Sequence, residues 1–349
     1  DPDLIATAAA QLAAAQRPVI LAGGGAKWTG AALQALASRL DAPVVQTANA
    51  RGVMFDHPLG VPASASLASV RALIEAADLV LAVGTELGPT DYDVYATGQS
   101  PRMARMIRID ICPAQLRRHP AELTIESTAE AAMDALLRSL PDTPPAAARG
   151  AERAAETRAA ALDEIGPAYR DMVEILAALR QALPACLMVG DSTQAIYAGN
   201  LYYDHDRPGG WFNAATGYGA LGYALPAAIG ASLGAPGARV LCIAGDGGAQ
   251  FTMPEIMAAV DARLPITFLI WNNHGYQEIA SAMEEVGVTV LGCDPTPPDF
   301  AATAQSFSIP FTTCDMTPES AAQAVTRMAQ IDGPSMIELR APRFLQDPA

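Results

Sequence analysis

Two turns in the C-terminal half carry the residues best suited to chemistry. The first, Gly245–Gly248, holds a single carboxylate among glycines, and the second, Asn272–Tyr276, opens with two asparagines. Each turn follows a short apolar run, and a helix-like segment separates the two runs, which is the pattern of a parallel β-α-β unit. Because the carboxyl ends of adjacent parallel strands meet at one edge of a sheet, we expect Asp246 and Asn273 to lie side by side there.

The residue types in these turns suit a metal ion bound to a diphosphate. One carboxylate, one amide oxygen and a loop carbonyl form a set of hard oxygen ligands for Mg²⁺, which completes its octahedron with phosphate oxygens and water. Gly247 and Gly248 let the backbone approach a diphosphate closely and direct N–H groups at it. Each turn alone is common in proteins that bind nothing there. Their combination on consecutive strands predicts a metal–diphosphate site.

A third glycine turn, Gly23–Gly25, follows the apolar run Pro18–Ala22 near the N-terminus. A strand, a glycine turn and a helix in this order are the pattern that cradles a dinucleotide pyrophosphate. Gln46 and Thr47 stand where an acidic residue would bind the ribose. The turn therefore leaves two alternatives open, a close-packed corner without a ligand or an NAD-type dehydrogenase that binds nicotinamide and does not depend on Mg²⁺.

The elements that position these turns are short apolar runs alternating with amphipathic segments, which predicts an α/β chain with two doubly wound parallel sheets. We expect domains over 1–140 and 166–349. Residues 141–165 are rich in proline, alanine and charge, and we expect a linker there, part extended and part helical. Strands are predicted at 18–22, 43–45, 79–83 and 106–109 in the first domain, and at 186–189, 239–243, 266–271 and 334–339 in the second.

Composition excludes several classes of protein. The chain has 349 residues, 51% of them hydrophobic, and a formal net charge of −15. The apolar content excludes global disorder, and the negative charge disfavours both nucleic acid and anionic membrane surfaces as partners. No apolar run reaches the roughly 18–20 residues that a membrane span needs. Nothing at the N-terminus resembles a signal peptide, and five scattered cysteines without metal-like spacing suit a reducing cytoplasm, the location we expect.

The two C-terminal turns, together with Thr216–Ala231, resemble the motif of thiamine diphosphate (ThDP) enzymes of the pyruvate decarboxylase and acetolactate synthase superfamily. The resemblance covers essentially the whole chain, with 1–140 similar to the family's middle domain and 166–349 similar to its diphosphate-binding domain. It implies ThDP and Mg²⁺ as cofactors, with Asp246, Asn273 and the Gly275 carbonyl as metal ligands.

The same resemblance implies roles for individual residues. The Gly219 carbonyl would accept a hydrogen bond from the cofactor's amino group, and Leu221 would be the apolar wedge beneath the bent cofactor. The implied cofactor site consists of Ser192, Thr193, Gln194, Gly219, Leu221, Gly245, Asp246, Gly247, Gly248, Asn273, Gly275 and Tyr276. The implied reaction is decarboxylation of a 2-oxo acid through a thiazolium enamine, which is then protonated or attacks a second carbonyl.

Two departures from the family pattern lead to further expectations. The family's N-terminal pyrimidine-binding domain, which supplies the activating glutamate, has no counterpart in this sequence, so we expect an incomplete chain that is inactive alone. The family's active site forms between subunits, which implies a homodimer or homotetramer. Asp91–Tyr95 and Arg105–Asp110 lack the signature associated with FAD in some relatives, and FAD is not expected.

The substrate is suggested by the stretches Trp271–Ile279 and Pro295–Phe300, which resemble the 5-guanidino-2-oxopentanoate (2-ketoarginine) decarboxylase branch. Glu278 lies one turn beyond the metal loop, where its carboxylate could pair with a guanidinium; the alternative is a solvated glutamate on a helix face. We therefore assign catalytic roles to Gly219, Leu221 and Glu278. The alternatives are an acetolactate synthase-type carboligase and, from another class, a non-catalytic two-domain module or fragment.

Overall fold

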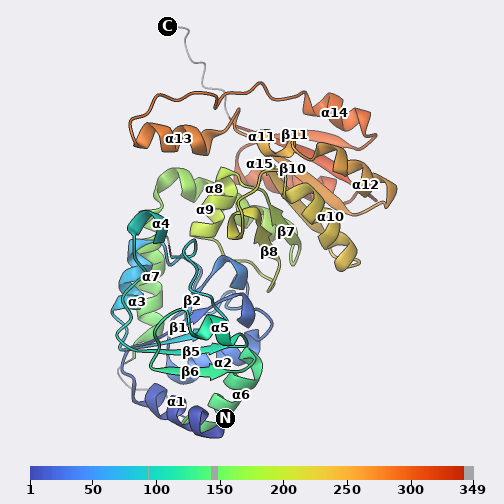
Figure 1. Ribbon diagram of the computed structural model, residues 1–349. Helices are drawn as coiled ribbons and strands as arrows, with labels where there is room; N and C mark the ends of the chain where they lie inside the picture. The colour runs from blue at the N-terminus through green and yellow to red at the C-terminus, as the bar shows by residue number, and fades with distance from the viewer. Residues whose placement is uncertain (93, 143–147, 342–349) are drawn as a thin grey trace. The chain divides into compact units, whose positions relative to one another are not determined.

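The computed structural model describes residues 1–92, 94–142 and 148–341 and divides into two compact units (Figure 1). The first unit comprises Asp1–Pro167 with Asn200–Gly209, and the second comprises Ala168–Gly199 with the chain from Gly210 onward. Asp93 of the expected flavin region and residues 143–147 of the expected linker lie outside the described residues. No helix in the described ranges is long and apolar enough to span a membrane.

The first unit is built on a six-stranded parallel sheet with the order β3-β2-β1-β4-β5-β6. The strands are β1 (Pro18–Ala22), β2 (Val44–Gln46), β3 (Gly60–Val61), β4 (Leu79–Val83), β5 (Met106–Asp110) and β6 (Leu123–Glu126). The helices are α1 (Pro2–Ala14), α2 (Gly30–Leu40), α3 (Ala68–Glu75), α4 (Val94–Thr97), α5 (Pro113–Leu116), α6 (Ala129–Ser139) and α7 (Gly150–Glu164). One core joins the sheet to α1, α2 and α6, and a second joins it to α3 and α7, so both faces are covered.

The second unit repeats this architecture with the strand order β11-β12-β10-β9-β7-β8, again all parallel. The strands are β7 (Leu187–Gly190), β8 (Trp211–Asn213), β9 (Val240–Gly245), β10 (Ile266–Asn272), β11 (Phe311–Asp315) and β12 (Ser335–Arg340). The helices are α8 (Gly166–Ala182), α9 (Gln194–Leu201), α10 (Ala224–Gly234), α11 (Asp246–Ala249), α12 (Ile256–Asp261), α13 (Gln277–Glu285), α14 (Phe300–Ser306) and α15 (Pro318–Met328). The predicted fold class, two doubly wound parallel α/β sheets, is confirmed.

The neighbouring strands β9 and β10 are fully buried, and their register pairs Trp271 with Gly245. Both strands therefore end at the same edge of the sheet. The turn that carries Asp246 and the turn that carries Asn273 leave the sheet together, as the sequence predicts.

Four strands were not predicted from the sequence, and each lies at an edge of its sheet: β3 and β6 in the first unit, β8 and β11 in the second. Edge strands are short and only partly covered, so they lack the continuous apolar run that marks a central parallel strand. β11, for example, has no fully buried residue, and β6 has a single one.

The described residues of the segment 141–165, where we expect a linker, belong to the first compact unit. The described part of this segment is mainly helix α7, which packs on α3 and buries Ala154, Thr157 and Ala161. The carboxylate of Glu164 accepts hydrogen bonds from the backbone N–H groups of Ala68 and Ser69 at 2.6 and 3.0 Å, which caps α3. Because the segment is rich in alanine, the sequence did not indicate that this amphipathic helix is packed in the first unit. The first boundary between the units follows Pro167.

Residues Asn200–Gly209 are a second departure, because they belong to the first unit although the chain around them builds the second. Arg51, which is 1% exposed, donates to the Tyr203 and Asn200 carbonyls at 2.8 and 2.9 Å. Burial lowers the pKa of this guanidinium to about 10, and the charge of Asp204 opposes that shift. Arg51 lies far in the sequence from Asn200 and Tyr203, so hydrophobic periodicity could not indicate this contact.

Candidate cofactor site

A cavity of ≈ 260 Å³ in the second unit is lined by residues that follow β7, β9 and β10, together with the loop before α10 and the start of α13. Open parallel α/β sheets bind ligands at this position, beyond the carboxyl ends of their strands. All twelve residues expected to bind the cofactor line this one cavity, and so does Glu278. The cavity is also lined by Tyr197, Gln277 and Ile279, to which the sequence assigned no role.

The three expected metal ligands converge inside this cavity. Nδ2 of Asn273 donates to Gln194 Oε1 at 2.8 Å, so the amide oxygen of Asn273 faces Asp246 Oδ1 at 3.2 Å and the Gly275 carbonyl at 3.0 Å. Asp246 is 1% exposed, and its Oδ2 atom is buried without a hydrogen-bond partner. Three oxygens that face one another without a proton between them are what a divalent cation would satisfy.

The donor chemistry of these residues fits Mg²⁺. The Asn273 amide can be placed with its nitrogen donating to Asp246 and Gly275 or, as a cation held there would require, with its oxygen facing them. Burial raises the pKa of Asp246, and backbone N–H groups, including that of Gly247, oppose the rise. The described residues contain no cluster of three or more His, Cys, Asp and Glu side chains suited to a metal.

Glycine is required at two places in the walls of the cavity. A Cβ atom on Gly247 would lie 2.5 Å from the ring of Tyr276. Gly275 has a φ of +140°, and a Cβ there would overlap the carbonyl of Cys293, which accepts the Tyr276 N–H at 2.8 Å. These side chains are absent because the backbone of the two turns must pack closely and still leave room for a ligand.

Asp191 organises one wall of the cavity, although the sequence predicted no separate role for it. It is completely buried, and its carboxylate accepts the N–H groups of Ser192, Gly222 and Ala224 at 2.8, 3.2 and 3.1 Å. Burial raises the pKa of Asp191 and these N–H groups oppose the rise. An aspartate directly after a buried strand was a signal that could have been used. The hydrogen bonds of Asp191 join the end of β7 to the loop that carries the predicted residues Gly219 and Leu221.

The predicted role of Gly219 is compatible with its surroundings. Gly219 has a φ of +67°, and its carbonyl accepts a hydrogen bond from Ser192 Oγ at 3.0 Å. A carbonyl oxygen has two lone pairs, so one acceptor position remains for a ligand.

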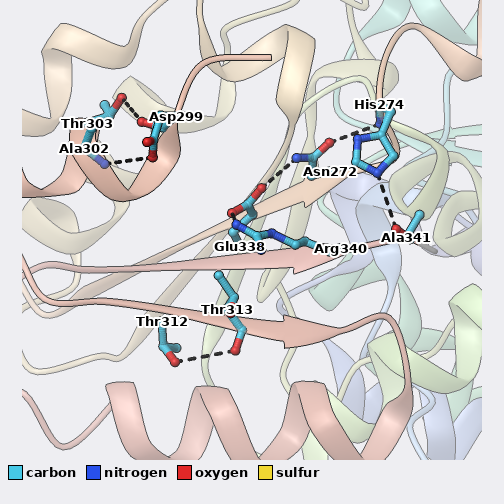
Figure 2. Close-up of polar contacts among 10 residues, drawn as sticks. All are labelled: Asn272, His274, Asp299, Ala302, Thr303, Thr312, Thr313, Glu338, Arg340 and Ala341. Atoms are coloured by element: carbon cyan, nitrogen blue, oxygen red, sulfur yellow. Dashed lines mark hydrogen bonds and ion pairs between the residues drawn. The ribbon is translucent and has the colours of Figure 1, made fainter. Parts of the chain in front are cut away.

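A polar network behind the metal loop was also missed from the sequence (Figure 2). Asn272, the last residue of β10, donates from Nδ2 to Glu338 Oε1 at 2.7 Å and accepts the His274 N–H at 3.1 Å. Glu338 lies on β12 and is 4% exposed, and its other oxygen accepts from Arg340 at 2.6 Å. The two adjacent asparagines thus face different ways: Asn273 lines the cavity, and Asn272 anchors the loop to the sheet.

Glu278 lies in the first turn of α13, and its environment differs from that of a solvated glutamate. The hydroxyl of Tyr169 donates to Glu278 Oε1 at 2.9 Å, and Glu278 Oε2 is buried without a hydrogen-bond partner. Glu278 thus lines the cavity with a carboxylate of which one oxygen has no hydrogen-bond partner.

Comparison with known families adds to this geometry. Residues 190–339 match the family described as thiamine pyrophosphate enzyme, C-terminal TPP binding domain, and residues 5–136 match thiamine pyrophosphate enzyme, central domain. The chain belongs to the thiamine pyrophosphate enzymes. Thiamine pyrophosphate is another name for ThDP, so the family predicted from the two C-terminal turns is confirmed.

The curated relatives of this thiamine pyrophosphate enzyme are longer proteins. It is 39% identical over 313 residues to a Pseudomonas aeruginosa protein named probable 2-ketoarginine decarboxylase AruI, with 87% of this chain and 55% of that protein covered. It is 27% identical over 349 residues to the Escherichia coli acetolactate synthase isozyme 1 large subunit, with 96% and 60% covered. The chain spans a little more than half the length of these relatives.

Among solved structures, the thiamine pyrophosphate enzyme resembles the ThDP-dependent 4-hydroxybenzoylformate decarboxylase of Rhodococcus jostii RHA1. The TM-score is 0.75 at 24% identity, and the match covers 97% of this chain and 64% of the other. This likeness shows a shared fold.

The Gly23–Gly25 turn lies in the part of the thiamine pyrophosphate enzyme that matches the central domain. Gly25 donates its N–H to the Gly84 carbonyl at 2.9 Å, and a Cβ on Gly25 would lie 2.8 Å from Gly84 Cα. Close packing against the turn at Gly84 accounts for Gly23 and Gly25. The alternative of an NAD-type dehydrogenase thus loses the feature on which it rested.

Proposed function

We propose that the cavity of the second unit binds ThDP through Mg²⁺ and that the whole protein decarboxylates a 2-oxo acid with a guanidino tail, of the 5-guanidino-2-oxopentanoate type. The observation that carries this proposal is the convergence in one cavity of the three oxygen ligands with the unpartnered carboxylate oxygen of Glu278. The similarity to a protein named probable 2-ketoarginine decarboxylase supports the choice of substrate.

In this proposal Asp246, Asn273 and the Gly275 carbonyl hold the metal. Ser192 and Thr193, just before α9, supply hydroxyl groups beside the first N–H groups of that helix, a combination that suits the diphosphate. Gly247 and Gly248 leave space for the diphosphate, and Gln194 keeps Asn273 in its metal-facing orientation through their hydrogen bond.

The remaining cavity residues orient the organic part of the cofactor. Bound ThDP supplies an electron sink for the loss of CO₂ from a 2-oxo acid. Leu221 offers an apolar surface beneath the cofactor, and Gly219 offers a carbonyl acceptor for its amino group. Asp191 fixes this loop through the N–H groups of Gly222 and Ala224, which reduces the reorganisation needed when the cofactor binds.

An acetolactate synthase-type carboligase is the second candidate, because the Escherichia coli relative covers nearly all of the chain. The lining of the cavity favours the guanidino substrate over it. A buried carboxylate oxygen without a partner is costly beside a small substrate that has no cationic group, but it is paired when a guanidinium occupies the cavity.

Oligomeric state and location belong to the proposal as well. We infer a homodimer or homotetramer, with a small 2-oxo acid as the ligand of the complete protein. No disulfide bond joins the described cysteines (Cys112, Cys186, Cys242, Cys293 and Cys314), which supports a reducing cytoplasm as the location.

Calorimetry with ThDP and Mg²⁺ tests the metal assignment. The wild type should bind ThDP only when Mg²⁺ is present, and Asp246→Ala should abolish this Mg²⁺-dependent binding because the single carboxylate ligand is lost. Asp261→Ala, which removes an exposed carboxylate at the end of α12, should bind like the wild type. Equal Mg²⁺-dependent ThDP binding by Asp246→Ala and the wild type would contradict the assignment of Asp246 as a metal ligand. Product analysis of the holoenzyme then separates the two reactions: CO₂ release from 5-guanidino-2-oxopentanoate supports the decarboxylase, and acetolactate from pyruvate supports the carboligase.

A further inference from the structure

The wall of the cavity at α13 differs in charge from the rest of its lining. Glu278 and Asp246 are the acidic residues that line the cavity, and none of the described lining residues is Lys, Arg or His. Asp246 faces the metal ligands, whereas Glu278 faces Tyr169 of α8. The charge of Glu278 is thus left for something that enters the cavity.

We propose that Tyr169 is a specificity-determining positioning residue, which holds the Glu278 carboxylate so that its free oxygen accepts a hydrogen bond from a guanidinium. This inference rests on the proposed function, because it assumes a cationic 2-oxo acid in the cavity. Tyr169 is not expected to touch the reacting atoms; it acts through Glu278.

The geometry explains why a phenol suits this task. A carboxylate has about four lone-pair positions, and Tyr169 uses one of them on Oε1 at 2.9 Å. The hydroxyl is neutral, so it fixes the rotamer of Glu278 without cancelling its charge, as Lys or Arg would. The atom Oε2 remains buried and without a partner. A guanidinium has several N–H donors in one plane and would supply the partner that Oε2 lacks.

The protonation state of Tyr169 supports the same role. Burial raises the pKa of its hydroxyl, and the negative charge of Glu278 raises it further. A raised pKa keeps the Tyr169 hydroxyl protonated, and thus a donor, at neutral pH. Helix α13 has no buried residue of its own, so the hydrogen bond between Tyr169 and Glu278 attaches its first turn to α8.

A comparison of two substrates tests the proposal on the holoenzyme loaded with ThDP and Mg²⁺. The pair is 5-guanidino-2-oxopentanoate and 2-oxooctanoate, which has a similar length and no charge on its tail. Tyr169→Phe should lower kcat/KM for 5-guanidino-2-oxopentanoate roughly three- to tenfold, mainly through KM. It should leave kcat/KM for 2-oxooctanoate unchanged. Glu278→Ala should lower kcat/KM for 5-guanidino-2-oxopentanoate roughly 10- to 100-fold. Tyr95→Phe, an exposed tyrosine of the first unit, is the control and should change neither.

The double variant and a binding measurement complete the test. Once Glu278 is replaced by alanine, Tyr169→Phe should have no further effect on the preference between the substrates. Calorimetry with 5-guanidinopentanoate, which lacks the oxo group, should show the same ranking of affinities. Equal loss for both substrates in Tyr169→Phe, or a full effect in the Glu278→Ala background, would overturn the role of Tyr169 and leave the proposed function intact. A wild type without preference for the guanidino acid would overturn both.

Discussion

At the scale of single residues, the adjacent asparagines Asn272 and Asn273 make different contacts. Asn273 turns its amide oxygen toward Asp246 and the Gly275 carbonyl, whereas Asn272 turns into the sheet and bonds Glu338. The alternation of side chains along a strand end separates them. His274, between them and Gly275, adopts a left-handed φ of 64°, and Asn272 accepts its N–H. The hydrogen bonds of Asn272 thus hold the loop that carries the Gly275 carbonyl, the expected metal ligand, against the sheet.

Gly275→Ala tests how tightly this loop is constrained. The added Cβ would overlap the Cys293 carbonyl at a φ that alanine rarely adopts, so we expect a loss of roughly 2–4 kcal/mol in the free energy of unfolding and no Mg²⁺-dependent ThDP binding. Denaturant unfolding and calorimetry measure the two effects. Gly230→Ala is the control: it lies in α10 with open space around it, and should gain up to about 1 kcal/mol. Similar changes in both variants would contradict the constraint.

At the scale of elements, the order of the parallel strands decides which turns meet. β10 lies between β9 and β12, so the metal loop has the Asp246 turn on one side and Glu338 on the other. The central strands were predictable because they are continuous apolar runs. The edge strands and the packed helix α7 were not, since alanine, proline and alternating charge describe a solvated connection and a helix with a narrow buried stripe equally well.

The contribution of β12 can be measured with Glu338→Ala. The substitution leaves the buried amide of Asn272 without its acceptor, and we expect a loss of about 1–3 kcal/mol in stability together with weaker Mg²⁺ binding in the presence of ThDP. Glu319→Ala, an exposed glutamate in the first turn of α15, should change neither quantity measurably. If Mg²⁺ affinity is retained while stability falls, the network supports the sheet and does not position the metal loop.

At the scale of the whole molecule, the chain consists of two units with separate cores, and the candidate cofactor site lies entirely in the second. The first unit matches the central domain of the thiamine pyrophosphate enzymes and carries its own buried charges. Asp91 is one of them: burial raises its pKa to about 6, the charge of Arg51 opposes the rise, and Glu86 adds to it.

The raised pKa of Asp91 predicts how stability depends on pH. The folded chain holds this proton more tightly than the unfolded chain, so the contribution of Asp91 to stability is complete below pH ~4 and is lost as the pH rises to about 6. Asp91→Asn should remove this fall and become more stable than the wild type by roughly 3 kcal/mol well above pH 6. Urea unfolding between pH 4 and 8 measures the difference. Asp134→Asn, on the exposed face of α6, should show no such window. A constant offset between Asp91→Asn and the wild type would refute the assignment.

The sequence by itself determined the fold class, the central strands and the two turns that carry Asp246 and Asn273, whereas the other residues of the candidate cofactor site were implied by the family resemblance. It could do so because glycine, carboxylate and amide residues directly after buried strands must meet at one sheet edge once the strands are parallel neighbours. Only the tertiary structure decided that α7 belongs to the first unit, that Asp191 and Glu338 hold the two sides of the cavity, and that Tyr169 meets Glu278. The last two are 109 positions apart. Local periodicity reports which face of an element is buried, but the partner that covers it is chosen by packing between distant segments.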